Sequence, residues 1–188
     1  MSLTSITSEI KKTHPHAGKK AVKTEEKKED IPEPEPLKEE PVKPRVDTAL
    51  KEYIDEVTLQ VQPYPTQSSQ AKHLAVYVSN QMGGPQSDSN SLSHELHIAQ
   101  LKADLKSNVI PIGFVKRGIF YHRALLFKVL ADRIGMPCSL VRGEYNRAWN
   151  EVTLVKDGKT SHYLVDLMKE PGKLLEVGGH AAGAYKKL

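Results

Sequence analysis

The sequence is poor in cysteine, in aromatic residues and in long apolar runs. It has a single Cys among 188 residues, which excludes an intramolecular disulfide and a cysteine-rich zinc site. No apolar stretch approaches the roughly 18–20 residues of a membrane-spanning helix, so we expect no membrane insertion. The first twenty residues lack the apolar segment of a secretory signal. We therefore expect a reducing compartment, by default the cytoplasm.

An excess of one charge is also missing. Lys and Arg number 27 and Asp and Glu 23, which leaves a net charge of +4. Because the surplus is not gathered into a run, we expect no nucleic-acid binding. The segment HELH places His94 and His97 at i and i+3, without the spacing of the zinc-protease motif HExxH, so we expect both to face solvent. The glycine-rich segments GGP and GGHAAG lack the GK[ST] of a phosphate loop. We expect no metal and no cofactor.

Residues 1–45 differ in composition from the rest of the chain. They contain six of the twelve Pro and no aromatic residue, and charged residues alternate with Pro in EEKKEDIPEPEPLKEEPVKPR. Such a segment cannot bury enough apolar surface to offset the entropy lost on ordering. We expect a disordered tail rich in Lys, Glu and Pro, with a docking motif for a partner as the alternative.

Apolar periodicity predicts helices from Val46 onward. Apolar residues at helical spacing predict one helix from Val46 to Val61, which Pro63 and Pro65 end, and a second over 67–82. We interpret residues 46–90 as a helical lead-in and loop. A third helix begins at Ser91 or Ser93, where serine oxygens can cap it. Its expected inner stripe is Leu92, Leu96, Ala99 and Leu105.

The following segment, over 119–134, is apolar on most sides, which predicts a helix buried on most sides. Gly135 ends it, and Pro137 prevents its continuation. A short strand over 138–143 and a hairpin over 148–168 follow, with Asp157 and Gly158 at the turn. We expect Trp149 to anchor the helix to the sheet. Residues after 169 are expected to be rich in coil, and 179–188 to form a C-terminal tail.

The order of these motifs resembles the transglutaminase-like superfamily, whose core is related to papain. That superfamily has G-x-C, a helix ending in G-I-P, then H-A-W-x-E-V and a strand ending in V-D. This chain has GMP at 135–137, AWNEV at 148–152 and VDL at 165–167. The resemblance implies an α+β fold in which helices are followed by a small antiparallel sheet.

The same resemblance locates the catalytic positions. Phe120 occupies the position of the nucleophile and Arg147 that of the histidine base, while Asp166 keeps the third position. Two of the three catalytic residues are therefore replaced. Phenylalanine offers no lone pair for attack, and arginine stays protonated near neutral pH.

A closer resemblance narrows the family. The segments HRALLFKVLADRIGMPCSLVRG and YLVDLMKEPGKLL resemble the peptidase-like domain of the enhanced-disease-resistance and constitutive-triple-response families. That domain lies on the N-terminal side of plant Raf-like kinases and at the C-terminal end of animal armadillo-repeat-containing protein 3. The resemblance covers about residues 92–177, within an expected peptidase-like domain over 91–178.

These observations favour a non-catalytic protein-interaction module on a degenerate peptidase scaffold, with an unidentified protein partner. The family resemblance places it in signalling or in a ciliary or flagellar assembly. The alternative is an enzyme that uses Cys138 with His122 or His162 and Asp166. Cys138 does not lie at a helix N-terminus, however, and we expect it to be buried as a small hydrophobe. Two arginines, at 123 and 142, are expected at the surface or as partners of Glu151 and Asp166.

Overall fold

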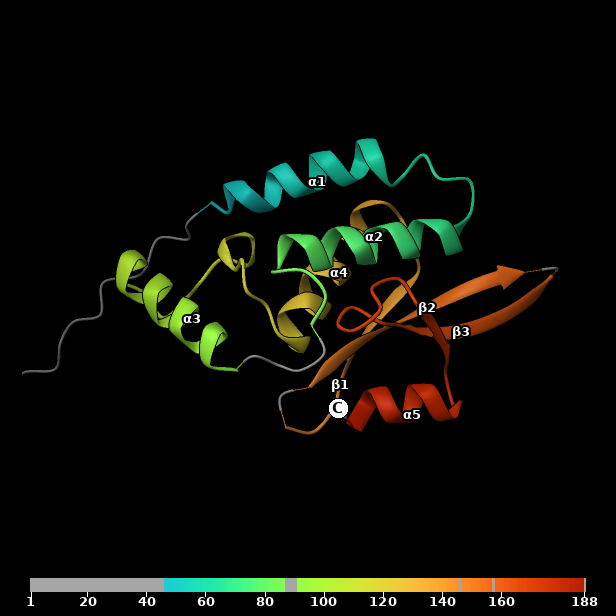
Figure 1. The fold of residues 1–188 in the computed structure, drawn as a ribbon. Coiled ribbons are helices and arrows are strands. Elements are labelled where there is room, and N and C mark those ends of the chain that lie inside the picture. Colours follow the sequence, from blue (N-terminus) through green and yellow to red (C-terminus); the bar gives the residue numbers. More distant parts are fainter. Residues whose placement is uncertain (1–45, 87–90, 146, 157, 188) are drawn as a thin grey trace, which may run out of the picture. The chain divides into compact units, whose positions relative to one another are not determined.

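The computed structural model describes residues 46–86, 91–145, 147–156 and 158–187, so the expected tail over 1–45 lies outside the described residues. The described residues form an α+β fold, as the sequence predicted (Figure 1). No helix within these ranges has the length and apolar content to cross a bilayer. In chain order, the elements are α1 (Thr48–Gln60), α2 (Gln67–Gln81), α3 (Ser91–Leu105), the 3-10 helix η1 (Ile112–Phe114), α4 (Phe120–Arg133), β1 (Cys138–Arg142), β2 (Ala148–Lys156), β3 (Lys159–Val165), β4 (Leu174–Glu176) and α5 (His180–Lys187).

The four strands form an antiparallel sheet in the order β1-β2-β3-β4. Asn150 of β2 lies opposite Leu140 of β1 and Val165 of β3, which fixes the register. The predicted hairpin is present, and Gly158 in its turn has a φ of +73°. Only glycine adopts this conformation without strain, which explains its place there. The other expected turn residue, Asp157, lies outside the described ranges.

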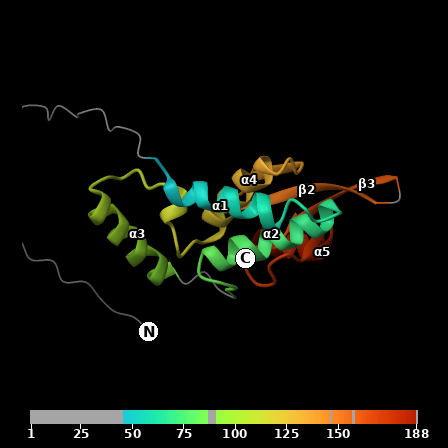
Figure 2. The same cartoon turned by 90° about the horizontal axis from the view of Figure 1, so that it is seen from above.

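Helix α4 packs on one face of the sheet and is the central helix, as its apolar sequence predicted. Leu126, Phe127 and Leu130 are fully buried. Helices α1 and α2 cover α4 and lie side by side (Figure 2). Tyr77 of α2 hydrogen-bonds Glu56 of α1 at 2.6 Å, which joins the two helices. The expected lead-in helices therefore share one core with α4 and the sheet.

The coil expected at the C-terminal end is wrong, because residues 180–187 form helix α5 on the opposite face of the sheet (Figure 1). Its Ala182 and Tyr185 are buried against Leu164. Trp149 packs in this second cluster, not between α4 and the sheet. The correction follows from strand alternation, since Trp149 points away from the face that Ala148 and Asn150 present to α4.

Helix α3 forms where expected, but its predicted inner stripe is wrong. Leu92 and Leu96 are 67% and 62% exposed, whereas His94 is only 8% exposed. The side of α3 that faces the protein carries His94, Ile98 and Leu101. Both stripes satisfy helical spacing. In the observed orientation of α3, the side chains of His94 and His97 make polar contacts with the main chain after η1.

Arg123 of α4 is the largest fully buried side chain, so the expectation of a surface position is wrong. Its five N–H groups make five hydrogen bonds of 2.8–3.1 Å. The acceptors are the hydroxyl of Ser79 and the main-chain carbonyls of Met82, Gly84, Gly118 and Leu167. Burial lowers the pKa of Arg123, and the charge of Asp166 opposes that shift. The guanidinium thus joins the end of α2, the start of α4 and the chain after β3.

We expect Arg123→Met to lower the free energy of unfolding by about 3–5 kcal/mol, because it leaves buried carbonyl groups without donors. Urea unfolding followed by circular dichroism measures this change. The control Arg133→Met alters an exposed arginine of the same helix and should cost less than about 0.5 kcal/mol. Equal stability of the two variants would contradict the role given to Arg123.

Candidate functional site

The first turn of α4 brings two of the three expected site residues together. Phe120 is the first residue of α4, and its side chain is half-buried. The guanidinium carbon of Arg147 lies 5.4 Å from the centroid of the Phe120 ring. The ring of Tyr185 meets Phe120 edge-on, with centroids 6.1 Å apart. The positions that the sequence motifs assign to a nucleophile and a base therefore hold a cation–π pair, which a tyrosine from α5 also contacts.

Asp166 lies directly after β3 and has a different structural role. Its carboxylate accepts N–H groups of Met168 at 2.7 Å and of Lys169 and Glu170 at 3.1 Å. The side chain is 4% exposed. It makes no ion pair with Arg147 in the described part of the chain, where Lys supplies the cation of every pair. Asp166 shapes the turn toward β4, because its oxygens satisfy three successive main-chain donors.

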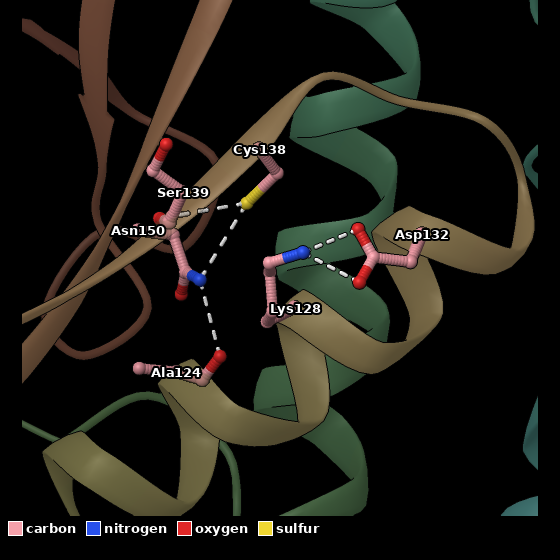
Figure 3. A network of polar contacts seen from close by, with 6 residues as sticks. All are labelled: Ala124, Lys128, Asp132, Cys138, Ser139 and Asn150. Carbon is pink, nitrogen blue, oxygen red and sulfur yellow. Dashed lines mark hydrogen bonds and ion pairs between the residues drawn. The ribbon is translucent and has the colours of Figure 1, made fainter.

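Cys138 begins β1 and is half-buried beside an amide (Figure 3). The Nδ2 atom of Asn150 lies 3.6 Å from its Sγ and also donates to the carbonyl of Ala124 at 3.1 Å. Burial raises the pKa of the thiol to about 11. Lys128, on the neighbouring turn of α4, pairs with Asp132 at 2.5 Å. At neutral pH the thiol is therefore protonated and a poor nucleophile.

Neither histidine proposed for the cysteine alternative contacts Cys138 through a hydrogen bond or ring contact in the described residues. His122 lies in the first turn of α4, with its ring 4.5 Å from that of His94. His162 lies on β3 and contacts the Thr153 hydroxyl at 3.1 Å. The structure thus places these residues in separate surroundings, with no base beside the thiol.

The histidines of HELH join His122 beneath α3, so the expectation that both face solvent is wrong. His94 Nδ1 lies 2.6 Å from the Arg117 carbonyl, and His97 Nε2 accepts the Lys116 N–H at 2.9 Å. Burial lowers the pKa of His122 to about 3, and the nearby charges of His94 and His97 add to this. Across the described ranges, no group of three His, Cys, Asp or Glu side chains could hold a metal ion.

Sequence reasoning missed two residues of this region. Arg123 lies three residues after Phe120 in a helix that is apolar on most sides, and that pattern is a signal for a buried cation. Tyr185 carries no comparable signal, because it lies in a short polar segment at the far end of the chain. Only the packing of α5 brings it to Phe120.

Comparison with known proteins gives a family match. A sequence model of the EDR1/CTR1/ARMC3 peptidase-like family matches residues 21–175. Human armadillo repeat-containing protein 3 is 49% identical over 154 residues, which cover 76% of this chain and 18% of that protein. In Arabidopsis thaliana, the probable serine/threonine-protein kinase SIS8 is 38% identical over 112 residues, and the serine/threonine-protein kinase CTR1 is 44% identical over 108 residues.

The aligned residues cover 57% and 55% of this chain in the two kinases. The chain spans 11–18% of the length of these three relatives. No solved structure matches the chain significantly.

We expect a double-mutant cycle on Phe120 and Arg147, with alanine at each position, to give a coupling of about 0.5–1 kcal/mol from the cation–π contact. Because the Phe120 ring is only half-buried, Phe120→Ala alone should cost about 1–2 kcal/mol, less than a fully buried ring. The matched cycle on Arg147 and Asp166 should give no coupling. Thermal and urea unfolding measure both, and a coupling confined to Arg147 and Asp166 would contradict this geometry.

The buried histidine predicts acid sensitivity. The pKa of His122 is about 3 in the folded chain, against a usual 6.5, so the unfolded chain binds more protons between these values. Neutral His122 therefore stabilises the fold fully above pH about 6.5, and this contribution is lost as the pH falls toward about 3. His122→Gln should lose stability less steeply with acid than the parent, in urea titrations at several pH values. His162→Gln, an exposed control, should follow the parent, and parallel curves for all three would refute the assignment.

Proposed function

Because the chain belongs to the EDR1/CTR1/ARMC3 peptidase-like family, we propose that it is a non-catalytic protein-interaction module on a degenerate cysteine-peptidase or transglutaminase-like scaffold. The resemblance found in the sequence motifs is thereby confirmed. The family match also begins earlier than those motifs and includes α1 and α2. The domain thus retains its core, and its function depends on what the former catalytic positions now hold.

One observation carries the proposal: Phe120 and Arg147 contact each other where a nucleophile and a base would meet. A benzyl side chain cannot form an acyl-enzyme, and a guanidinium cannot accept a proton near neutral pH. Tyr185 closes a further side of the Phe120 ring. This arrangement supports binding without chemistry at these positions.

The cysteine-dependent alternative has less support. Catalytic cysteines are activated by a neighbouring base or a helix N-terminus, and both lower the thiol pKa. Cys138 starts a strand, and its side-chain neighbour is the Asn150 amide. Burial moves its pKa in the opposite direction.

We place the module in the cytoplasm, in signalling or in a ciliary or flagellar assembly. Support comes from the sequence similarity of this chain to parts of two plant protein kinases and of human armadillo repeat-containing protein 3. Co-purification of the full chain with a defined partner, followed by imaging of the tagged protein, tests this setting. Exclusive recovery from a secretory compartment would contradict it.

We expect a thiol-directed activity probe to label Cys138 more slowly than it labels free cysteine at pH 7. The reason is that burial raises the thiol pKa to about 11, so less thiolate is present. The labelling rate should rise with pH toward that value without a plateau near pH 7. Intact-mass spectrometry over time measures the rate, and Cys138→Ser is the control for labelling elsewhere.

Peptide-hydrolysis and amine-transfer assays on the same preparation complete this test. Turnover that is present in the parent and lost in Cys138→Ser would establish the enzyme alternative. Turnover lost in Phe120→Ala or Arg147→Ala instead would show that chemistry persists at the replaced positions. Either result would overturn the proposed function.

A further inference from the structure

A cavity of about 510 Å³ lies between the first turns of α4 and the end of β1. Its lining includes Tyr121 and Leu125 of α4, Leu140 and Arg142 of β1, and Gly143 and Arg147 of the following turn. We name it the arginine cleft. Arg147 also contacts Phe120, so the cleft adjoins the former catalytic positions. Its volume suits a few residues of a bound chain.

Among the described residues, the two arginines of the cleft have no acidic partner. Neither Arg142 nor Arg147 makes a side-chain hydrogen bond or ion pair with any residue that the structure describes. The Nη1 atom of Arg147 is buried without an acceptor, which is an uncommon state for a charged donor. Glu144, the nearest acid in the turn, is exposed and does not line the cleft. The site therefore offers two cations for which the described chain supplies no anion.

The remaining lining of the cleft is largely apolar. Tyr121 and Leu125 lie at i and i+4 on one side of α4, and each is 40% exposed. Leu140 adds a half-buried aliphatic surface. A ligand that suits both the arginines and the apolar lining has a carboxylate beside an aliphatic or aromatic side chain. Arginine binds carboxylates through paired N–H groups, so it suits such a ligand better than a point charge does.

Main-chain hydrogen bonds and close packing involve the described residues of the turn that carries Arg147. The Gly143 N–H donates to the Arg147 carbonyl at 2.9 Å, and the Arg147 N–H donates to the Glu144 carbonyl at 3.1 Å. Gly143 packs on Trp149, where any side chain would meet the indole ring. At the tip, Tyr145 is 91% exposed and has a φ of +55°, a costly conformation for a bulky residue. An exposed aromatic residue beside the cleft suits recognition at the rim.

We propose that the arginine cleft binds an extended acidic peptide of a partner protein, with a carboxylate on Arg142 and Arg147 and an apolar side chain on Tyr121 and Leu125. This inference rests on the proposed interaction function and assigns it a surface and a partner chemistry. A peptide fits better than a nucleic acid, because half of the lining is apolar and the cations do not form a stripe that could follow a phosphate backbone.

The test uses the full chain and two fluorescein-labelled, acetylated hexapeptides. The probe is Asp-Glu-Leu-Phe-Asp-Glu, and its neutral match is Asn-Gln-Leu-Phe-Asn-Gln. Fluorescence polarisation should show saturable binding of the acidic probe and about tenfold weaker binding of the neutral one, since charge-assisted hydrogen bonds are lost. Arg142→Glu alone should weaken binding by about tenfold or more. Because Arg142 is exposed and makes no described contact, this variant should fold normally.

Two further variants distinguish binding at the cleft from non-specific attraction by the net charge of the protein. Arg142→Glu with Arg147→Glu should abolish binding, whereas Lys102→Glu with Arg133→Glu, which alters the net charge equally at exposed sites outside the cleft, should leave it within about twofold. Absence of saturable binding, equal affinity for the neutral peptide, or equal loss in both double variants would overturn the proposal. Tighter binding of a labelled oligouridine, lost in the same cleft variants, would also overturn it in favour of nucleic acid.

Mass spectrometry of the bound peptide distinguishes the proposed non-catalytic function from the proposed binding at the arginine cleft. Recovery of the intact acidic probe supports both proposals. Cleavage of the probe, with binding that still depends on Arg142, would support the cleft and overturn the non-catalytic function. Binding of a defined partner that is unchanged in the Arg142 and Arg147 variants would overturn the cleft and leave the interaction function standing.

Discussion

The buried guanidinium of Arg123 is the interaction on which the arrangement of this domain depends. Its acceptors come from three separate parts of the chain: the end of α2, the residue before Ile119 and the residue after Asp166. Helix ends leave carbonyl groups without partners, and a cation beside a helix C-terminus also interacts favourably with its dipole. One side chain therefore satisfies polar groups that would otherwise oppose burial, and it fixes where α4 begins relative to the end of β3.

The position of α4 relative to the end of β3 forms a frame that a cysteine peptidase also needs. The catalytic nucleophile of such an enzyme begins a buried helix, and the acid that orients its base ends a strand. The sequence motifs assign these two positions to Phe120, which begins α4, and to Asp166, which follows β3. Asp166 stabilises a turn through three main-chain N–H groups, which requires neither a histidine nor a substrate. The frame can thus persist for structural reasons alone. Asn150 has a similar role, since it ties β2 to α4 through the Ala124 carbonyl beside an inert thiol.

Apolar periodicity predicted the elements that bury large side chains, namely α1, α2, α4 and the hairpin. It could not predict α5, because an isolated helix of eight residues is marginal and this one is stabilised by burying Ala182 and Tyr185. It could not choose the buried side of α3, because the expected stripe with Leu92 and Leu96 and the observed one with His94, Ile98 and Leu101 both have helical spacing. At the site, the motifs placed Phe120, Arg147 and Asp166, but contacts between distant segments decide their roles. The spacing of residues in the sequence could not predict the cation–π pair or the three N–H groups that Asp166 accepts.

The sequence motifs lead us to expect a histidine where this chain has Arg147, and the two residues would give the cleft different chemistry. A histidine there would titrate near pH 7 and could exchange protons, whereas arginine is a permanent cation with planar donors. Its guanidinium carbon lies 5.4 Å from the centroid of the Phe120 ring, and its Nη1 atom has no acceptor in the described chain. A charged donor left without an acceptor is destabilising for the free domain. A ligand carboxylate that reached this atom would supply the missing acceptor, and Arg147 could keep its contact with Phe120. The guanidinium, which cannot exchange protons near neutral pH, is thus also the group whose charge would favour the anionic ligand that we propose for the cleft.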